Sequence, residues 1–330
     1  TNHGLRSSFV MKFWEENGTL QWTKSLNQES LAYQSTISID SNNDMYVSGN
    51  YDCGTATCTV IEGLDAQPMQ WYTSEGIFIA KLWENGTWAW INSAGQRSIL
   101  CGSGNSQSSF SASVISDSDG GLYITGDYFK QEWDSSGNFA GYCYMTSLAF
   151  GSALMNVTSD GPATYIAKAN TSTGSWEWAI GTNGDDLDYI NGLSVTNSTI
   201  RAHGYTNSDS LEFGNNTFTN NADGFTGNSN GPTGYAPFHV TVNPNGTWGE
   251  IIAPGVSSDS SANTRLAESS SSNLAVMGTA WPGSSLQFGN TNLVIPSQTG
   301  YTDQFTSYVA LYASSQEDLD DDGDGVSDLS

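Results

Sequence analysis

The sequence predicts an all-β fold: a β-propeller of four to five blades, built from repeats of ~70 residues with extra hairpins between the blocks. Three observations predict it. Short apolar runs flank tight turns, one block of residues recurs along the whole chain, and no run shows helical periodicity. Between residues 76 and 125, two apolar runs flank Asn85-Gly86 and two more flank Asp119-Gly120-Gly121. This pattern is typical of two consecutive β-hairpins.

The first hairpin of the block occurs five times, at offsets of 69, 87, 73 and 70 residues. Its copies begin at Phe9, Phe78, Tyr165, Phe238 and Tyr308. A turn and a tryptophan-containing strand follow the first three copies. Two of these strands carry a tryptophan pair at i and i+2, Trp88/Trp90 and Trp176/Trp178. Because such residues share one face of a regular strand, we expect each pair to pack between neighbouring blades.

A second hairpin ends in a glycine that recurs every 74 to 78 residues. These glycines are Gly49, Gly126, Gly204 and Gly278. A third element reads Ser-Leu-x-Phe-Gly and begins at Ser147, Ser210 and Ser285, so we expect one small extra hairpin in those repeats. We assign residues 1–315 to the repeat domain and residues 316–330 to an acidic linker that opens a following stalk.

The net charge argues against two classes of partner. Nine basic and 34 acidic residues give 9 − 34 = −25, and such a field repels phosphate backbones and anionic lipid. We therefore expect no nucleic acid partner. No window approaches the roughly 18 apolar residues of a membrane span, so we expect no direct membrane insertion. Since neither an initiator Met nor a signal peptide precedes Thr1, we expect a mature product whose signal peptide has been removed.

Four cysteines allow three disulfide connectivities. They are Cys53, Cys58, Cys101 and Cys143. A bridge between Cys53 and Cys58 would close a small local loop and leave Cys101 to pair with Cys143 across a repeat. A zinc site is the alternative, but no histidine lies near them in the sequence and no C-x₂-C spacing occurs. Disulfides are favoured, and they indicate an oxidising, extracytoplasmic setting.

Seven Asn-X-Ser/Thr acceptors for N-linked glycans are present. They are Asn17, Asn85, Asn156, Asn170, Asn197, Asn215 and Asn245. Asn17, Asn85 and Asn245 share one repeat position, the turn of the first hairpin. We interpret these three first as turn residues and second as glycosylation sites.

Residues 117–126, 78–90 and 165–178 carry a motif with a family resemblance. The sequence resembles the bacterial and archaeal β-propeller repeat proteins of the SBBP family over residues 9–314. Copies in that family run approximately as aspartate, turn, Tyr-Val-Thr-Gly, a Phe-Gly hairpin, Phe-Val-Ala-Lys, then Gly and Trp. The later copies depart from it, with His203 and Met277 where Thr is usual. The resemblance implies a secreted or surface-displayed propeller, and it transfers no catalytic residue.

The composition changes after Ser315 to an acidic segment. Its aspartates are spaced like the oxygen ligands of an acidic calcium loop, in which a glycine permits the turn. The proposed ligands of Ca²⁺ are Asp318, Asp320, Asp322, Asp324 and Asp328. The segment resembles the opening of a thrombospondin type 3 repeat, which implies that a calcium-binding stalk follows Ser330. A solvated acidic tail is the alternative.

Patterns for nucleophilic or metal-dependent catalysis are weak. The segment from Gly227 to Gly231 has the letters of a nucleophile elbow, but it lies in a Gly/Asn-rich loop with no helix after it. His3, His203 and His239 have no paired metal ligands in the sequence. We expect His203 and His239 to occupy ordinary strand positions.

Two further sets of charged residues have a structural and a functional interpretation. The densest acidic loop within the repeats contains Asp185, Asp186 and Asp188. A solvated turn or a second calcium site is favoured there over the paired carboxylates of a glycosidase. Three lysines share one repeat position, namely Lys12, Lys81 and Lys168. Ion pairs to neighbouring aspartates are favoured over an anion-binding axis.

Tryptophans outside the paired positions are candidates for stacking on sugar rings. They are Trp14, Trp71, Trp133 and Trp281, and ordinary packing is the alternative for each. Residues 173–176 resemble the tryptophan repeats of pyrroloquinoline-quinone dehydrogenases, but no cofactor-contacting residues can be located.

The repeat is cut so that one strand is surplus at the chain ends. The strand at Phe9–Phe13 duplicates the one at Tyr308–Tyr312. Unpaired strands can pair with another chain, so we expect self-association by strand exchange or head-to-tail contact. The sequence therefore predicts an extracellular, non-enzymatic structural or adhesive surface protein. The alternative is a secreted propeller that binds or cleaves carbohydrate, with glycans as partners.

Overall fold

The computed structural model describes residues 9–25, 33–52, 75–100, 105–110, 113–116, 120–133, 139–142, 144–156, 163–184, 186, 188–196, 199–220, 236–252, 255–256, 265–268, 274–280, 283, 285–288, 291–296 and 306–312. The regular structure in these ranges is entirely β-strand, and they contain no helix that could cross a membrane. The all-β prediction is confirmed, and the repeated unit is an antiparallel meander of four strands, the form of a propeller blade.

In the part of the chain that the structure describes, five blade sheets follow one another, here called sheets I to V. Sheet I contains β1 (Phe9–Phe13) and β2 (Leu20–Ser25). Sheet II contains β3 (Tyr33–Ile39), β4 (Met45–Asp52), β5 (Glu75–Leu82) and β6 (Trp88–Leu100). Sheet III contains β8 (Ser113–Ser116), β9 (Gly121–Trp133), β13 (Ala163–Asn170) and β14 (Trp176–Gly181). Sheet IV contains β16 (Asp188–Thr196), β17 (Thr199–Thr206), β20 (Ala236–Val242) and β21 (Trp248–Ile252). Sheet V contains β23 (Arg265–Glu268), β24 (Leu274–Ala280) and β27 (Thr306–Tyr312).

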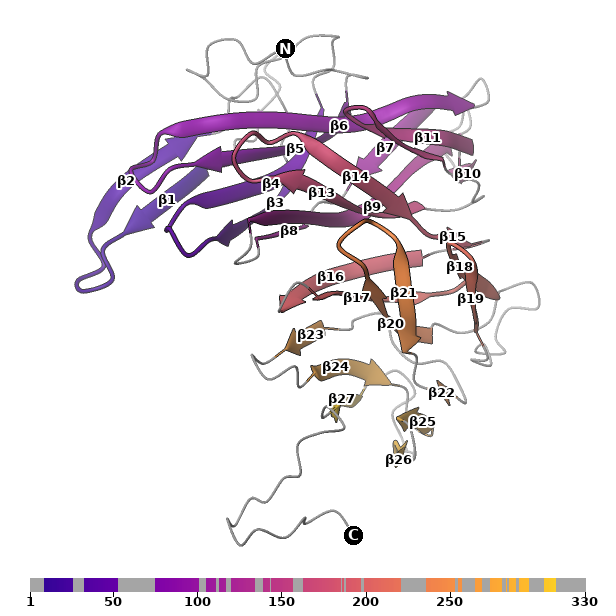
Figure 1. Cartoon of the computed structure of the whole chain (residues 1–330). Helices are drawn as coiled ribbons and strands as arrows, with labels where there is room; N and C mark the ends of the chain where they lie inside the picture. The colour runs from indigo at the N-terminus through magenta and orange to yellow at the C-terminus, as the bar shows by residue number, and fades with distance from the viewer. Residues whose placement is uncertain are drawn as a thin grey trace, which may run out of the picture.

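The two end sheets are incomplete within the described residues. Sheet I has only the last two strands of the meander, whereas sheet V has only the first three. In Figure 1 sheets II and III form the upper part of the molecule, sheet IV lies below them, and sheet V lies at the bottom. Sheets I and V are therefore separated by the three complete blades.

The predicted extra hairpins are present, and they connect neighbouring sheets. Their strands are β11 (Tyr144–Phe150) with β12 (Ala153–Asn156), β18 (Ser210–Phe213) with β19 (Asn216–Thr219), and β25 (Ser285–Phe288) with β26 (Thr291–Val294). Each hairpin pairs with the chain that continues the fourth strand of the preceding sheet. These partners are the end of β6, β15 (Asn183–Gly184) and β22 (Gly255–Val256). Two more strands, β7 (Asn105–Phe110) and β10 (Phe139–Tyr142), pair with β9.

Apolar layers fill the space between sheets I and II, II and III, and III and IV. The third strands of sheets II and III contribute side chains to the layers on both of their sides. On β5, Phe78 and Leu82 pack toward sheet I, together with Val10. The alternate residues Ile77 and Ile79 pack toward sheet III. This two-sided burial follows from the period of two along a strand.

The tryptophan pairs do not share one face, which corrects the sequence prediction. Trp90 packs in the layer between sheets II and III, whereas Trp88 packs against the layer between sheets I and II. The cause is an irregularity in the β5–β6 pairing: Lys81 pairs with Trp90 and the next residue, Leu82, pairs with Trp88. A bulge of this kind changes the side from which a residue projects. The β13–β14 pairing has the same shift beside Trp176 and Trp178.

A tryptophan of the fourth strand contacts the next sheet in the same way at three of the described junctions. Its indole N–H donates to a carbonyl oxygen in the turn between the third and fourth strands of that sheet. These bonds run from Trp22 to Glu84 (3.3 Å), from Trp90 to Thr171 (3.1 Å) and from Trp178 to Pro244 (3.0 Å). A glycine with positive φ in the same turn lies against the indole ring. A Cβ at Gly86, Gly174 or Gly246 would meet the ring at 2.8, 2.5 or 2.7 Å, respectively.

A matched pair of glycine variants isolates this contact. Gly18 and Gly174 have φ of +67° and +72°, but only Gly174 lies against an indole, that of Trp90. We expect Gly18→Ala to cost about 1–2 kcal/mol of unfolding free energy, from backbone strain alone. Gly174→Ala should cost about 1–3 kcal/mol more, because the added methyl displaces the ring. Urea denaturation followed by tryptophan fluorescence measures both; equal losses in the two variants would contradict the role of the contact.

Candidate functional site

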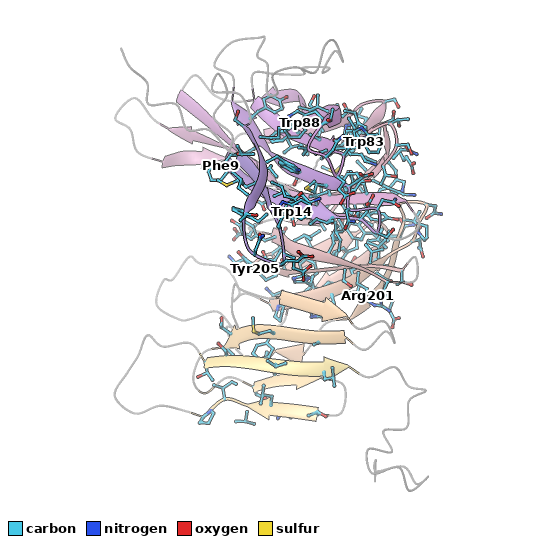
Figure 2. All side chains as sticks on the ribbon, turned by 90° about the vertical axis from the view of Figure 1, so that its left-hand side faces the viewer. Phe9, Trp14, Trp83, Trp88, Arg201 and Tyr205 are labelled. Carbon is cyan, nitrogen blue, oxygen red and sulfur yellow. The ribbon has the colours of Figure 1, made fainter. Side chains whose placement is uncertain are left out.

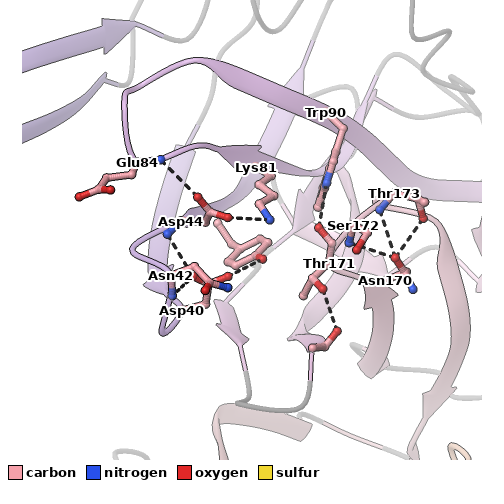
Figure 3. A network of polar contacts seen from close by, with 12 residues as sticks. Asp40, Asn42, Asp44, Lys81, Glu84, Trp90, Asn170, Thr171, Ser172 and Thr173 are labelled. Atoms are coloured by element: carbon pink, nitrogen blue, oxygen red, sulfur yellow. Dashed lines mark hydrogen bonds and ion pairs between the residues drawn. The ribbon is translucent and has the colours of Figure 1, made fainter.

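The edge of the array that carries these turns is a connected polar network, shown in Figure 3. Asp40 organises the turn between β3 and β4. Its Oδ1 accepts the backbone N–H groups of Asn42 (2.9 Å) and Asp44 (3.0 Å), and its Oδ2 accepts the Tyr46 hydroxyl (2.9 Å). Burial and the hydrogen bond to Asp40 raise the pKa of Tyr46, so the phenol stays protonated and continues to donate.

A buried ion pair joins this turn to the third strand of sheet II. Lys81 Nζ lies 3.0 Å from Asp44 Oδ2, and their side chains are only 7% and 10% exposed. The same ammonium lies 4.3 Å from the ring centroid of Trp83. Asp44 Oδ1 also accepts the backbone N–H of Glu84 at 3.3 Å. The pair therefore fixes the β5–β6 turn that receives Trp22.

The three lysines at the shared repeat position all form ion pairs, so the structural interpretation is confirmed for the set. Lys12 pairs with Glu84 (3.2 Å) and Lys168 pairs with Glu177 (3.1 Å). Only Lys81 pairs with an aspartate as expected; the other two use glutamates. An anion-binding axis is thus not needed to explain these charges.

Two substitutions that remove one carboxylate each should differ strongly in cost. Asp44→Asn leaves the buried Lys81 ammonium without its counter-charge, so we expect a loss of about 3–5 kcal/mol in unfolding free energy. Glu177→Gln breaks a more exposed pair with Lys168, and solvent screening limits that loss to about 1 kcal/mol or less. Chemical denaturation at neutral pH compares the two variants. A loss at Asp44 no larger than the loss at Glu177 would contradict the structural role of the buried pair.

The acidic loop predicted to be solvated contains a buried carboxylate. Asp188 is 1% exposed, and both of its oxygens accept the Ser208 hydroxyl at 3.0 Å; it also accepts the Thr206 hydroxyl. Asp186 accepts from the side-chain amide of Asn207 at 3.2 Å. The expectation of a solvated turn is therefore wrong for Asp188, because its carboxylate is buried and accepts hydrogen bonds from the hydroxyl groups of two protein side chains. Asp185 lies outside the described residues.

No candidate metal centre forms among the residues that the structure describes, since they contain no group of three His, Cys, Asp or Glu side chains suited to one. His203 and His239 face each other across β17 and β20, with ring centroids 6.4 Å apart. Both are buried, and burial lowers the pKa of His239 to about 4. Its imidazole is therefore neutral at neutral pH. Both occupy strand positions, as the sequence predicted.

Two tryptophans are exposed at equivalent turns, and the sequence identified only one. Trp14 is 54% exposed and Trp83 is 44% exposed. Each begins the turn between the third and fourth strands and closes it by hydrogen bonds of its own backbone. Their positions, two residues after Lys12 and Lys81, are the signal that would have identified Trp83. Figure 2 labels both. Trp71 and Trp281, and the side chain of Trp133, are not among the described positions.

Three of the predicted glycan-acceptor asparagines form hydrogen bonds within turns. The side-chain oxygens of Asn17, Asn85 and Asn245 each accept the backbone N–H of the threonine two residues later, at 2.9, 2.9 and 3.2 Å. Their interpretation as turn residues is confirmed. Asn156 and Asn215 are exposed in strand and turn positions, whereas Asn170 is half-buried. Asn197 lies outside the described residues, and glycosylation of any of them stays a prediction.

Several predicted sites fall on residues that the structure does not describe. They are the cysteines Cys53, Cys58, Cys101 and Cys143, the calcium ligands Asp318, Asp320, Asp322, Asp324 and Asp328, residues 227–231, and His3. Disulfides and bound Ca²⁺ therefore stay predictions.

The two end sheets expose apolar faces. The N-face consists of Phe9, Met11 and Phe13 on β1 with Leu20 on β2, exposed by 63%, 42%, 53% and 51%. The C-face consists of Met277 on β24 with Val309 and Leu311 on β27, exposed by 46%, 69% and 66%. Figure 2 looks toward the β1–β2 side of the molecule and labels Phe9. Contiguous apolar patches of this kind mark interaction sites.

Comparisons with known proteins find similarity in structure alone. No protein-family model matches the chain, and no curated protein sequence matches it. Among solved structures, a β-fructofuranosidase mutant from Microbacterium saccharophilum is similar at 10% identity and a TM-score of 0.34, over 85% of this chain and 56% of that one. A levansucrase from Gluconacetobacter diazotrophicus is similar at 6% identity and a TM-score of 0.35, over 86% of this chain and 63% of that one. The chain thus spans less than two thirds of either.

These structures are enzymes, which contradicts the expectation of a non-enzymatic protein, and we withdraw that expectation. At such TM-scores the likeness assigns no activity, substrate or catalytic residue to this chain.

Proposed function

We propose that this chain self-associates, with its copies joined through their end sheets, in an extracellular setting. The observation that carries the proposal is the contrast between the N-face and its counterparts inside the array. The residues at the positions of Phe9, Met11 and Phe13 in sheets II, III and IV are buried to 2% exposure or less. They are Phe78, Ala80 and Leu82; Tyr165, Ala167 and Ala169; and Phe238, Val240 and Val242.

Burial of the end faces supplies the driving force for association. Covering a large apolar side chain contributes about 1.5–3 kcal/mol, so the four residues of the N-face together favour contact by several kcal/mol. The charge of −25 opposes association through repulsion between copies, and salt screens that repulsion. Assembly should therefore strengthen as ionic strength rises. The extracellular setting rests on the four cysteines, the seven sequons and the resemblance to surface-displayed repeat proteins.

A variant with a charge on both end faces tests the proposal. We expect the wild-type chain to associate in a concentration-dependent way in analytical ultracentrifugation, and Met11→Asp combined with Val309→Asp to stay monomeric at every concentration. Val294→Asp is the matched control, because Val294 is 62% exposed but lies on the small β25–β26 hairpin rather than on an end face. A monomeric wild type, or a double variant that associates like the wild type, would contradict the proposal.

Carbohydrate binding is a second candidate function, favoured by the exposed tryptophans at the turn edge. Trp14 and Trp83 are accompanied there by Asn17, Glu84 and Asn85, all exposed. Aromatic faces that stack on the apolar side of a sugar ring, beside amide and carboxylate acceptors for its hydroxyls, make up a sugar-binding surface.

Affinity electrophoresis through gels that contain a soluble neutral polysaccharide, with dextran and xylan as probes, tests the second candidate. The wild type should be retarded in at least one gel, and Trp14→Ala combined with Trp83→Ala should lose most of that retardation. Leu154→Ala, at an exposed aliphatic residue, serves as the control. Equal mobility of the wild type with and without both polysaccharides would contradict a carbohydrate role for these tryptophans.

A further inference from the structure

We infer that the copies join head to tail: the C-face of one copy packs on the N-face of the next, so that the junction between copies repeats the junction between consecutive sheets within a copy. This inference rests on the proposed function and identifies its partner, a second copy of this chain, and the geometry of the contact.

The N-face is the side of a blade that receives the preceding sheet. Inside the array, the positions equivalent to Phe9 and Phe13 in sheet II are Phe78 and Leu82, and both pack against sheet I, where Val10 contacts them. Sheets III and IV use the same side of their third strands against sheets II and III. Sheet I alone has no preceding sheet among the described residues, which explains why its equivalent side is exposed.

The C-face is the opposite side of a blade, the one that contacts the following sheet. Val309 occupies the repeat position of Ile79 and Ile166. Ile79 packs toward sheet III and Ile166 packs toward sheet IV, and both are fully buried. Val309 is 69% exposed at that position.

The second strand shows the same contrast on this side of the blade. Met277 is 46% exposed, whereas its equivalents are buried to 3% exposure or less. Those equivalents are Ser48, Thr125 and His203. Sheet V therefore exposes the side of a blade that packs on a following sheet. Sheet I exposes the side that packs on a preceding sheet.

The N-face is thus complementary to the C-face, and neither face is complementary to a second copy of itself. Each of the three junctions from sheet I to sheet IV pairs the forward side of one sheet with the backward side of the next. A junction of two N-faces or of two C-faces would have no counterpart inside the molecule. A contact between different surfaces is heterologous, so it leaves a free N-face and a free C-face after each addition and continues as an open chain or closes as a ring of copies.

Mixing two single variants tests the polarity. Met11→Asp blocks the N-face and leaves the C-face intact, whereas Val309→Asp does the reverse. We expect each variant alone to sediment as a monomer, and the equimolar mixture to form dimers, because only one junction, between the two unmodified faces, can form. Species larger than a dimer should be absent from the mixture. Val294→Asp should associate like the wild type.

The outcomes separate the two levels of the proposal. A monomeric wild type overturns the proposed function itself. A wild type that associates, with a mixture that stays monomeric, overturns the head-to-tail contact alone. A single variant that dimerises without its complement also overturns it, because an N-face to N-face or C-face to C-face contact would then exist. Far-ultraviolet circular dichroism and thermal unfolding check that each variant is folded, and Phe9→Ser with Leu311→Ser provides a milder second pair.

Discussion

The contact between an indole ring and the glycine turn of the next sheet is the interaction on which the rest of the structure depends. It combines a hydrogen bond with close packing of a ring on a backbone that has no side chain. Trp90 shows how much it organises: its N–H reaches Thr171, its ring covers Gly174, and its other surface joins the layer that contains Ile79. One hydrogen bond contributes only about 1 kcal/mol, but three repeats of the same contact fix the spacing of four sheets.

A molecule built in this way is close to one-dimensional, since each sheet contacts mainly its neighbours. The extra hairpins strengthen this character, because the hairpin β11–β12 of sheet III pairs with β6 of sheet II. Arrays of this kind usually need end units with a polar outer face to stay soluble. Here the outer faces of sheets I and V are apolar. Faces of this kind are buried between the inner sheets, but at the two ends of the array they are exposed. The proposed self-association would cover both.

Much of the architecture could be predicted from the sequence, because local chemistry determines it. Asn85-Gly86 specifies a tight hairpin, and the structure places Gly86 at a φ of +79° in that turn. The Ser-Leu-x-Phe-Gly segments specify the extra hairpins, and the lysine ion pairs follow from the repeat position of Lys81. These features depend on residues that are near one another in the chain or equivalent between repeats.

Features that depend on irregular pairing or on distant residues could not be predicted. The bulge beside Lys81 turns Trp88 and Trp90 to opposite sides of the sheet, and no residue type in the strand predicts this bulge. The burial of Asp188 depends on Ser208, twenty residues away. The exposed faces could not be identified either, since Phe9 and Phe78 look alike in the sequence and differ only in whether another sheet covers them.

Electron cryomicroscopy of the assembled wild-type chain tests the central claim most directly. The head-to-tail account predicts an unbroken series of sheets, in which sheet V of one copy faces sheet I of the next and Val309 lies near Met11 across the junction. A single copy closed on itself through sheets I and V would contradict the account. Copies joined through strand edges rather than through these two faces would contradict it as well.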